Sequence, residues 1–275
     1  MGMPHLFVSN SPSQNLSSRL MQLKSKLRNN TLTVGSWITL AHPAIAEIMS
    51  RRGFDWVVID LEHSVINIRE AEELIRVINL CGNTPLVRLS SNDSVQIKRV
   101  MDAGSAGIIL PMVRSLEDID MAFSAIHYPP IGIRGVGLAR AQSYGAKFHE
   151  YKSWLEMSAV LIAQIENIDA VNNIDEILSS DKVDGYIIGP YDLSASMGVP
   201  GELDHPDVIA AIKKIKDAGL SANKPGGLHL VEPDPSELDS LIGEGFLFLA
   251  YSVDIRMLDI SCSKGVKVRD KNIDQ

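Results

Sequence analysis

Cysteine is scarce in this chain, which has 275 residues and only Cys81 and Cys262. Two cysteines, each within or beside a helical pattern, do not form the dense framework of a small secreted domain, so we expect both to be reduced in a cytoplasmic protein. Basic residues are also few, because 26 lysines and arginines face 34 acidic residues and leave a net charge of −8. A surface of this sign gains little from binding a polyphosphate, so nucleic acid is not an expected partner.

Long hydrophobic runs are absent as well. No apolar stretch approaches the roughly 18 residues that a membrane-spanning helix needs, and a run such as 246–250 is far too short. Membrane is therefore not an expected partner. Residues 1–15 lack a basic start followed by a long apolar run, so we expect no signal peptide.

The residues that are present suit a packed globular chain, since 45% are hydrophobic and 22% are charged. From Thr31 onward, short β-branched or aliphatic runs alternate with amphipathic runs. The runs predict strands at 32–40, 55–60, 84–88, 107–111, 159–165, 184–188, 225–230 and 246–250. Several of these strands are apolar on both faces, which is typical of a parallel sheet covered on both sides.

Helix signals follow most of the predicted strands. Polar or proline start residues precede five of the amphipathic runs, at Asn67, Ser115, Asn167, Pro206 and Asp234. Glycines are expected to end helices at 53, 82, 104, 219 and 243. Eight strand–helix units in succession favour one closed (β/α)8 TIM barrel. A doubly wound open sheet is the alternative, but the segment LAHPAIAE after the first strand has no glycine for a phosphate-binding turn.

The expected domain boundaries follow from this alternation. Residues 1–30 are expected to form a loose arm and then a helix whose Leu16, Leu20, Leu23 and Leu27 cover one end of the core. Residues 31–275 are expected to form a single barrel domain. Residues 128–158 interrupt the rhythm and are expected to fold over one face as a loop.

Polar side chains follow four of the predicted strands at their C-terminal ends, where the active site of such a barrel lies. They are Asp60, Glu62, His63, Arg88, Gln164, Glu166, Tyr191 and Asp192. Ionisable groups that converge there are costly to desolvate unless they hold a metal or a charged ligand. The sequence therefore predicts a site at this mouth.

Glu166 and Asp192 are the candidate metal ligands. Two carboxylates, with the other positions left to water and substrate, suit Mg²⁺, Mn²⁺ or Co²⁺, although Asp192 alone could equally cap the next helix. His63 could act as a base near neutral pH. Arg88 could pair with a carboxylate or a developing oxyanion, and Glu62 could be its buried ion-pair partner.

Other ionisable residues have more ordinary interpretations. Four histidines are interpreted as satisfied surface or loop residues: His127, His149, His205 and His229. A tri-histidine zinc site is therefore not expected. Asp102, late in a predicted helix, is interpreted as a solvated residue. A Schiff-base aldolase needs a lysine near the mouth, whereas Lys182 and Lys224 precede strands, so a metal-based route to carbanion stabilisation is favoured over an imine.

Six motifs in fixed order carry a resemblance to a known family: GFDWVVIDLEHS, VRLSSNDSVQIKRVMDAG, ILPMV, YPPIGIRGVGLARA, QIEN and GPYDLSASMG. Over about residues 31–262 the chain resembles the HpcH/HpaI-type class II pyruvate aldolases. The resemblance implies a TIM barrel, assembled as a hexameric trimer of dimers with C-terminal helices exchanged between partners. It also implies metal-dependent, reversible cleavage of a 4-hydroxy-2-oxo acid, often a 2-keto-3-deoxy sugar acid, to pyruvate and an aldehyde.

By matching motif position, the resemblance implies that Glu166 and Asp192 bind the metal and that His63 is the base. It further implies that Arg88 stabilises the transition state, that Asp102 raises the basicity of His63, and that Gln164 and the backbone at Tyr191 contact pyruvate. Three departures border the expected substrate mouth, because Tyr191 replaces a small residue, Leu89 a proline and Ser252 a frequent glycine. They leave the aldehyde partner open.

Two other functions are weighed against this one. A condensing enzyme of the same barrel type would join a 2-oxo acid to another acceptor, as in a citrate synthase, but the loops after the strands carry no evident basic cluster for coenzyme A phosphates. A non-catalytic scaffold would be expected to lack at least one of Glu166, Asp192, Arg88 and His63, and all four are present.

Overall fold

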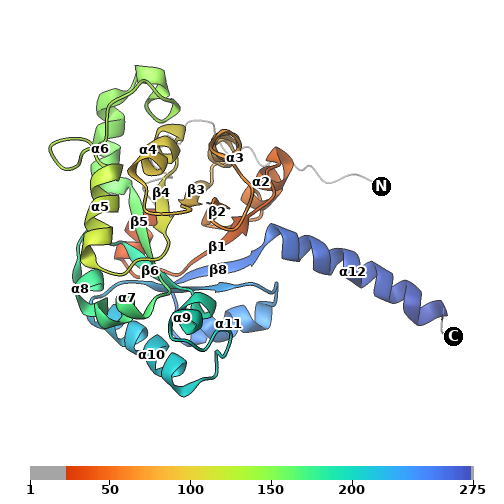
Figure 1. Ribbon diagram of the computed structural model, residues 1–275. Coiled ribbons are helices and arrows are strands. Elements are labelled where there is room, and N and C mark those ends of the chain that lie inside the picture. Colours follow the sequence, from red (N-terminus) through yellow and green to blue (C-terminus); the bar gives the residue numbers. More distant parts are fainter. Residues whose placement is uncertain (1–22, 274–275) are drawn as a thin grey trace, which may run out of the picture.

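The computed structural model describes residues 23–273 and contains a closed barrel in which eight parallel strands pair in chain order, with β8 returning to β1 (Figure 1). The strands are β1 (Thr33–Ile38), β2 (Trp56–Asp60), β3 (Thr84–Arg88), β4 (Gly107–Leu110), β5 (Val160–Ile165), β6 (Gly185–Ile188), β7 (Gly226–Leu230) and β8 (Phe248–Val253). The predicted TIM barrel and the position of every predicted strand are confirmed, and the open-sheet alternative is wrong.

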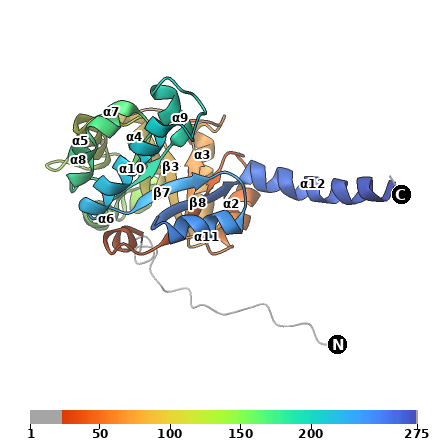
Figure 2. The same cartoon turned by 90° about the horizontal axis from the view of Figure 1, so that it is seen from below.

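Helices surround the barrel, as the two views in Figures 1 and 2 show. They are α2 (Pro43–Ser50), α3 (Ile68–Leu80), α4 (Ser94–Ala103), α5 (Leu116–Ile126), α6 (Phe148–Ser158), α7 (Ile168–Asn172), α8 (Ile174–Ser179), α9 (Pro190–Ser196), α10 (Pro206–Ser221), α11 (Pro235–Gly243) and α12 (Asp254–Ile273). Strands β2, β4, β5 and β6 are buried throughout, because side chains on one face fill the barrel and those on the other pack under the helices.

Local sequence signals place most helix ends. Asn67 forms a capping box with Glu70 at the start of α3, and Gly104 ends α4 in the left-handed conformation, both as predicted. Gly219 is a correction, since α10 continues to Ser221. This glycine instead leaves room for Tyr186, because a Cβ atom there would lie 2.4 Å from the Tyr186 ring and hydroxyl. Gly243 is the last residue of α11, and the left-handed glycine is Gly245.

The segment 128–158 is a second correction, because it is not a plain loop. It contains a 3-10 helix, η1 (Arg140–Gly145), and then α6. Arg134 anchors it, since this buried guanidinium donates to Ile126 O, to Tyr151 Oη and to the Asp102 carboxylate at 2.5 Å. An arginine surrounded by acceptors and tyrosine rings fixes an otherwise irregular backbone.

The two ends of the described chain differ. Leu23 and Leu27 are buried, as predicted for the covering helix, whereas Leu16 and Leu20 lie outside the described residues. At the other end, α12 projects away from the barrel in both views and packs against β1 and β8. Asp254 caps this junction by accepting from Thr39 N and Leu40 N. Within residues 23–273, no helix combines the length and apolar character needed to cross a bilayer.

Candidate active site

Arg88, the last residue of β3, is held in one orientation at the mouth of the barrel. Its Nε and Nη2 donate to the two carboxylate oxygens of Asp60, the last residue of β2, at 2.9 and 2.6 Å. Burial opposes ionisation of Asp60, but the hydrogen bonds and charge of Arg88 outweigh it and lower the pKa of this carboxyl. Asp60 Oδ1 also accepts from the backbone N–H groups of Glu62 and His63. Asp60 therefore fixes both the arginine and the following turn.

Glu62 faces the site with one carboxylate oxygen unsatisfied. Its Oε2 lies 3.2 Å from Arg88 Nη1, which confirms the predicted ion pair. The contact lacks hydrogen-bond geometry, so this buried oxygen has no hydrogen-bond partner among the described residues. Burial, opposed by Arg88 and aided by the charges of Glu166 and Asp192, raises the pKa of Glu62 to about 7. Three carboxylates therefore lie close enough to repel one another.

Glu166, which follows β5, is buried and doubly held. Its Oε1 accepts from Met112 N at 2.7 Å and its Oε2 from Gln164 Nε2 at 2.5 Å. Met112 has a φ of 53°, a strained value for a non-glycine residue that is typical of functional sites. A Cβ atom on Gly189 would lie 2.7 Å from Glu166 Oε2, so this glycine leaves room for the carboxylate. Burial raises the pKa of Glu166, and Asp192 adds to the rise.

Asp192 lies in the first turn of α9, directly after β6, and is exposed. The residue at the cap position is Gly189, and no side chain caps this helix. Asp192 makes no side-chain hydrogen bond within the described residues, so nothing here supports the alternative that it serves as a helix cap. Its charge raises the pKa values of both Glu62 and Glu166, so Asp192 belongs to the same group of carboxylates.

This donor set fits a divalent cation. Burial, together with the charges of neighbouring carboxylates, raises the pKa values of Glu62 and Glu166, and a cation beside such groups stabilises their anionic forms. Glu62 Oε2 has the charge of Arg88 beside it but accepts no hydrogen bond among the described residues, so it can accept one from a bound water or substrate. Over residues 23–273, however, no group of three or more His, Cys, Asp or Glu side chains is placed to hold a metal ion by itself. Glu166 and Asp192 would then need water or substrate oxygens to complete the coordination.

The remaining predicted site residues lie in different surroundings. His63 is exposed and its Nε2 lies 3.9 Å from Glu62 Oε2. Gln164 is buried beside Glu166, and Tyr191 is 63% exposed at the start of α9. Asp102 is not brought to His63 within one chain. It sits near the C-terminal end of α4, which runs away from the mouth, and it pairs with Arg134.

Sequence reasoning missed His229 and Trp37, which lie beside Arg88 at the mouth. His229 is a correction, because it lies in β7 rather than on the surface or in a loop, and its ring stacks on Trp37 of β1. The Arg88 guanidinium lies 4.4 Å from the Trp37 ring centre. The flanking leucines in GLHL, within a strand whose residues are buried or half-buried, could have indicated an interior histidine. His127 is a further correction, since it is buried and stacks on Phe123.

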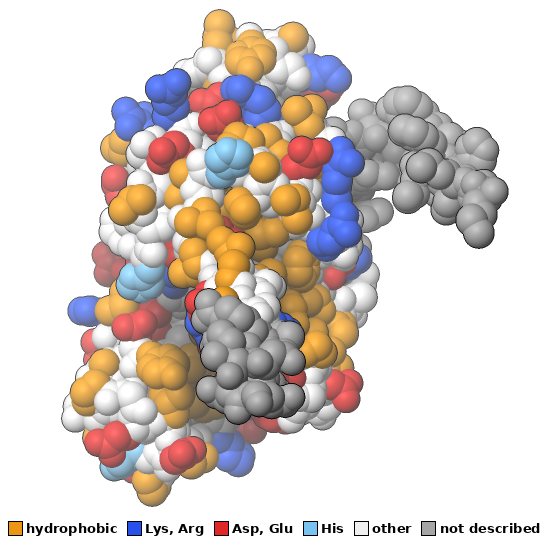
Figure 3. Space-filling view, turned by 90° about the vertical axis from the view of Figure 1, so that its right-hand side faces the viewer, with side chains coloured by type: hydrophobic (Ala, Val, Ile, Leu, Met, Phe, Trp, Pro, Cys, Tyr) orange, Lys and Arg blue, Asp and Glu red, His pale blue; other side chains and the backbone are white. Residues whose placement is uncertain are grey.

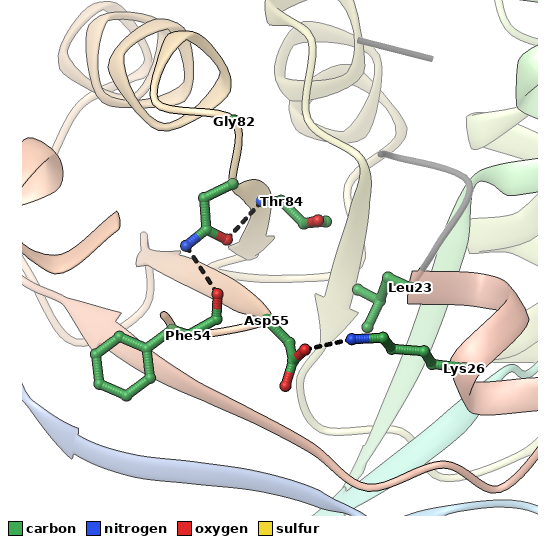
Figure 4. A pocket seen from close by; sticks show the side chains of 7 residues that line it. Leu23, Lys26, Phe54, Asp55, Gly82 and Thr84 are labelled. Atoms are coloured by element: carbon green, nitrogen blue, oxygen red, sulfur yellow. Dashed lines mark hydrogen bonds and ion pairs between the residues drawn. The ribbon is translucent and has the colours of Figure 1, made fainter. Parts of the chain in front are cut away.

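The lysines and a separate cavity lie at the other end of the barrel. Lys224 Nζ donates to Ser180 O and Val183 O, before β6 begins, as its position before a strand predicted. A cavity of about 240 Å³ lies where β2 and β3 begin, and Figure 4 shows its polar groups. Lys26 pairs with Asp55, and Asn83 bonds the backbone of Phe54 and Thr84. These groups satisfy each other and stabilise the fold.

A closed parallel barrel with carboxylates and an arginine at the carboxyl ends of its strands defines a (β/α)8-barrel enzyme. The chain belongs to the HpcH/HpaI aldolase/citrate lyase family, whose model matches residues 33–259.

The chain is 38% identical to a hydroxypyruvate/pyruvate aldolase of Sagittula stellata, over 86% of this chain and 93% of that protein. It is 37% identical to a 4-hydroxy-2-oxo-heptane-1,7-dioate aldolase of Salmonella paratyphi C, over 86% and 89%. The crystal structure of an HpcH/HpaI aldolase/citrate lyase family protein from Burkholderia cenocepacia matches with a TM-score of 0.85 at 28% identity, over 90% and 99%.

Proposed function

We propose that this protein is a metal-dependent pyruvate aldolase that reversibly cleaves a 4-hydroxy-2-oxo acid to pyruvate and an aldehyde. The carbon–carbon lyase class follows from relatives named as aldolases over most of their length. The observation that carries the metal dependence is the buried Glu166, whose pKa is raised by burial and by the charge of Asp192 at the same mouth. A cation bound by these two carboxylates would offset that repulsion.

Glu166 and Asp192 would hold the cation, which is Mg²⁺, Mn²⁺ or Co²⁺ by its oxygen ligands. When bound, it supplies positive charge to the enolate oxygen of pyruvate. Gln164 Nε2 and Met112 N hold the Glu166 carboxylate in place. Pyruvate would lie against Gln164 and the backbone at Tyr191, where α9 begins.

Arg88 would stabilise the negative charge that develops when the carbon–carbon bond breaks. Its guanidinium is already fixed by Asp60 and by the Trp37 face, so little reorganisation is needed in the transition state. His63, exposed at the same mouth, would accept the proton of the C4 hydroxyl, directly or through a water.

The family resemblance implies that Asp102 raises the basicity of His63. This role requires a second copy of the chain, because within one chain the Asp102 carboxylate pairs with Arg134, away from His63. We propose a homo-oligomer, a hexamer built as a trimer of dimers in which α12 is exchanged. Figure 3 looks onto the face from which α12 projects and shows hydrophobic side chains gathered there. Ile255 and Leu258 on α12 are exposed within one chain, which supports a partner for this helix.

A cytoplasmic location stays a prediction, and Cys81 and Cys262 are both free thiols.

A test of function uses pyruvate with a panel of aldehydes and identifies products by mass. Aldol products are expected with Mg²⁺, Mn²⁺ or Co²⁺, and EDTA is expected to abolish them. Full activity in EDTA together with borohydride trapping of pyruvate on the protein would overturn the proposal in favour of an imine. Release of free thiol from acetyl-CoA in the presence of oxaloacetate would instead support the condensing enzyme. That alternative has less support, because the relatives are named as aldolases.

A further inference from the structure

His229 belongs to a column of side chains inside the barrel that ends at the reacting centre. Its ring stacks on Trp37 with centroids 5.0 Å apart and planes 18° from parallel. The same indole ring lies 4.4 Å from the Arg88 guanidinium carbon. Strands β7, β1 and β3 therefore each contribute one member, and Arg88 is the member that the proposed function uses.

No hydrogen bond among the described residues orients the ring of Trp37. The indole is 2% exposed and its Nε1 has no hydrogen-bond partner among the described residues. Packing alone must therefore set the tilt of the ring, and the stacked His229 ring supplies a flat contact for it. A smaller or non-planar side chain at position 229 would leave the indole free to tilt. The Arg88 guanidinium, which Asp60 holds along one edge, would then lose the flat contact that supports its face.

His229 itself is oriented by the backbone of β8. Its Nε2 lies 3.2 Å from Ser252 O, and the same carbonyl accepts from Ser36 Oγ at 3.2 Å. Ser252 has a φ of 56° and sits beside the register shift in the β1–β8 pairing, while its Oγ donates to Val231 O. This left-handed position explains why glycine is frequent there. The unusual serine turns a carbonyl toward His229 and bonds β8 to the end of β7.

The histidine stays neutral in this column. Burial lowers the pKa of His229 to about 4, Arg88 contributes to the fall, and the Ser252 carbonyl and Asp60 oppose it. A neutral imidazole that donates Nε2–H to Ser252 O stacks on the indole without repelling the nearby Arg88 cation. Both the stack and the hydrogen bond are therefore kept at neutral pH.

We propose that His229 is a positioning residue for the aldol reaction, acting through Trp37 to set the orientation of the Arg88 guanidinium. The proposal rests on the proposed function for its effect on rate. Because Arg88 would act on charge that develops in the transition state, mispositioning it should lower kcat more than it raises KM.

Three substitutions separate the parts of the column. His229→Phe keeps a stacking ring without the donor, His229→Gln keeps an amide donor without the ring, and His229→Leu keeps neither. We expect kcat for cleavage to fall about tenfold in His229→Leu and His229→Gln with KM changed less than about threefold, and His229→Phe to recover most of the rate. His149→Leu, on the exposed face of α6, is the matched control and should leave both constants unchanged.

A spectroscopic readout is independent of aldolase activity. Tryptophan emission should change as His229 gains a proton near pH 4, and this change should disappear in both His229→Phe and Trp37→Phe, with circular dichroism checking that the fold persists. Unchanged kcat in His229→Leu, or a kcat loss that His229→Phe does not restore, would overturn the proposal. A wild-type protein that shows the emission change but cleaves no oxo acid would refute the proposed function and leave the column intact.

Discussion

Arg88 shows how far a single residue is determined by its neighbours. Asp60 takes two of its N–H groups, Glu62 lies beside a third nitrogen, and Trp37 covers the guanidinium face. A flexible cationic side chain would lose conformational entropy on binding substrate, whereas Arg88 is already ordered. The pairing of Arg88 with Glu62 could be predicted from the sequence, because Arg88 ends β3 and Glu62 follows the neighbouring strand β2.

Arg88→Lys should therefore be damaging although the charge is kept. A lysine cannot make the two-pronged contact with Asp60 or present a flat cation to Trp37. We expect kcat to fall about 100-fold, measured by steady-state cleavage of a 4-hydroxy-2-oxo acid. Arg76→Lys, which changes an exposed arginine paired with Glu72 on α3, is the control. A kcat of Arg88→Lys within about twofold of wild type would show that the two-pronged contact with Asp60 is not needed.

The pH dependence of stability should carry a contribution from His229. Its pKa is about 4 in the folded chain and about 6.5 in an unfolded one. Between pH 6.5 and pH 4, His229 is protonated in the unfolded chain but neutral in the folded one. The free energy of unfolding therefore falls as the pH drops through this range.

His229→Phe should remove this contribution. Urea unfolding measures this. Between pH 7 and pH 4.5 we expect the free energy of unfolding to fall by about 2 kcal/mol less in the variant than in wild type. Equal losses in the two proteins would mean that His229 takes up its proton without cost in the fold.

His229 and Asp102 show what sequence reasoning lacks at this scale. A histidine in a strand is interpreted as surface or interior according to its neighbours in space, and His229 owes its interior position to Trp37 and to the left-handed Ser252. Asp102 shows the opposite limit. Its partner within the chain, Arg134, is 32 residues away in an irregular segment, which no local pattern predicts.

At the scale of elements, strands were the most predictable part of the chain. Runs such as WVVID and VLIAQI are buried along their whole length, and a continuous apolar run bounded by turn signals is a direct consequence of that burial. Helix ends were less predictable. Gly219 looks like a helix stop, but its reason for being glycine is the Tyr186 ring of β6, a contact across elements.

Two helix glycines should respond to alanine in opposite directions. Gly219→Ala places a methyl group against the Tyr186 ring and should lower the free energy of unfolding by about 1–3 kcal/mol. Gly243→Ala, at the end of α11 with nothing within 4 Å, should raise it by about 0.5 kcal/mol through helix propensity. Denaturant unfolding of both variants measures this. Stabilisation by Gly219→Ala would show that Tyr186 moves aside at no cost.

At the scale of the whole molecule, α12 is the feature that one chain does not explain. It begins at Asp254, directly after β8, and projects away from the barrel in both views, with Leu258 54% exposed. An isolated helix of this kind gains most of its stability from packing on a partner. The barrel follows from alternating patterns along one chain, whereas a partner for α12 leaves no comparable local pattern.

Leu258→Glu should reduce the mass of the assembly. We expect light scattering after size-exclusion chromatography to give a homo-oligomer for wild type and a smaller species for the variant, because a charge is costly in an apolar interface. Ile209→Glu on α10, where the isoleucine is also 54% exposed, is the matched control and should leave the mass unchanged. A wild-type monomer would contradict the proposed assembly.

Binding of Mn²⁺ to metal-stripped protein, measured by titration calorimetry, tests directly whether Glu166 and Asp192 hold the ion. We expect one ion per chain for wild type, a loss of about tenfold or more in affinity for Glu166→Gln and for Asp192→Asn, and unchanged affinity for the distant Asp120→Asn. Equal affinity in wild type and in both mouth variants would contradict the claim that these two carboxylates bind the catalytic ion.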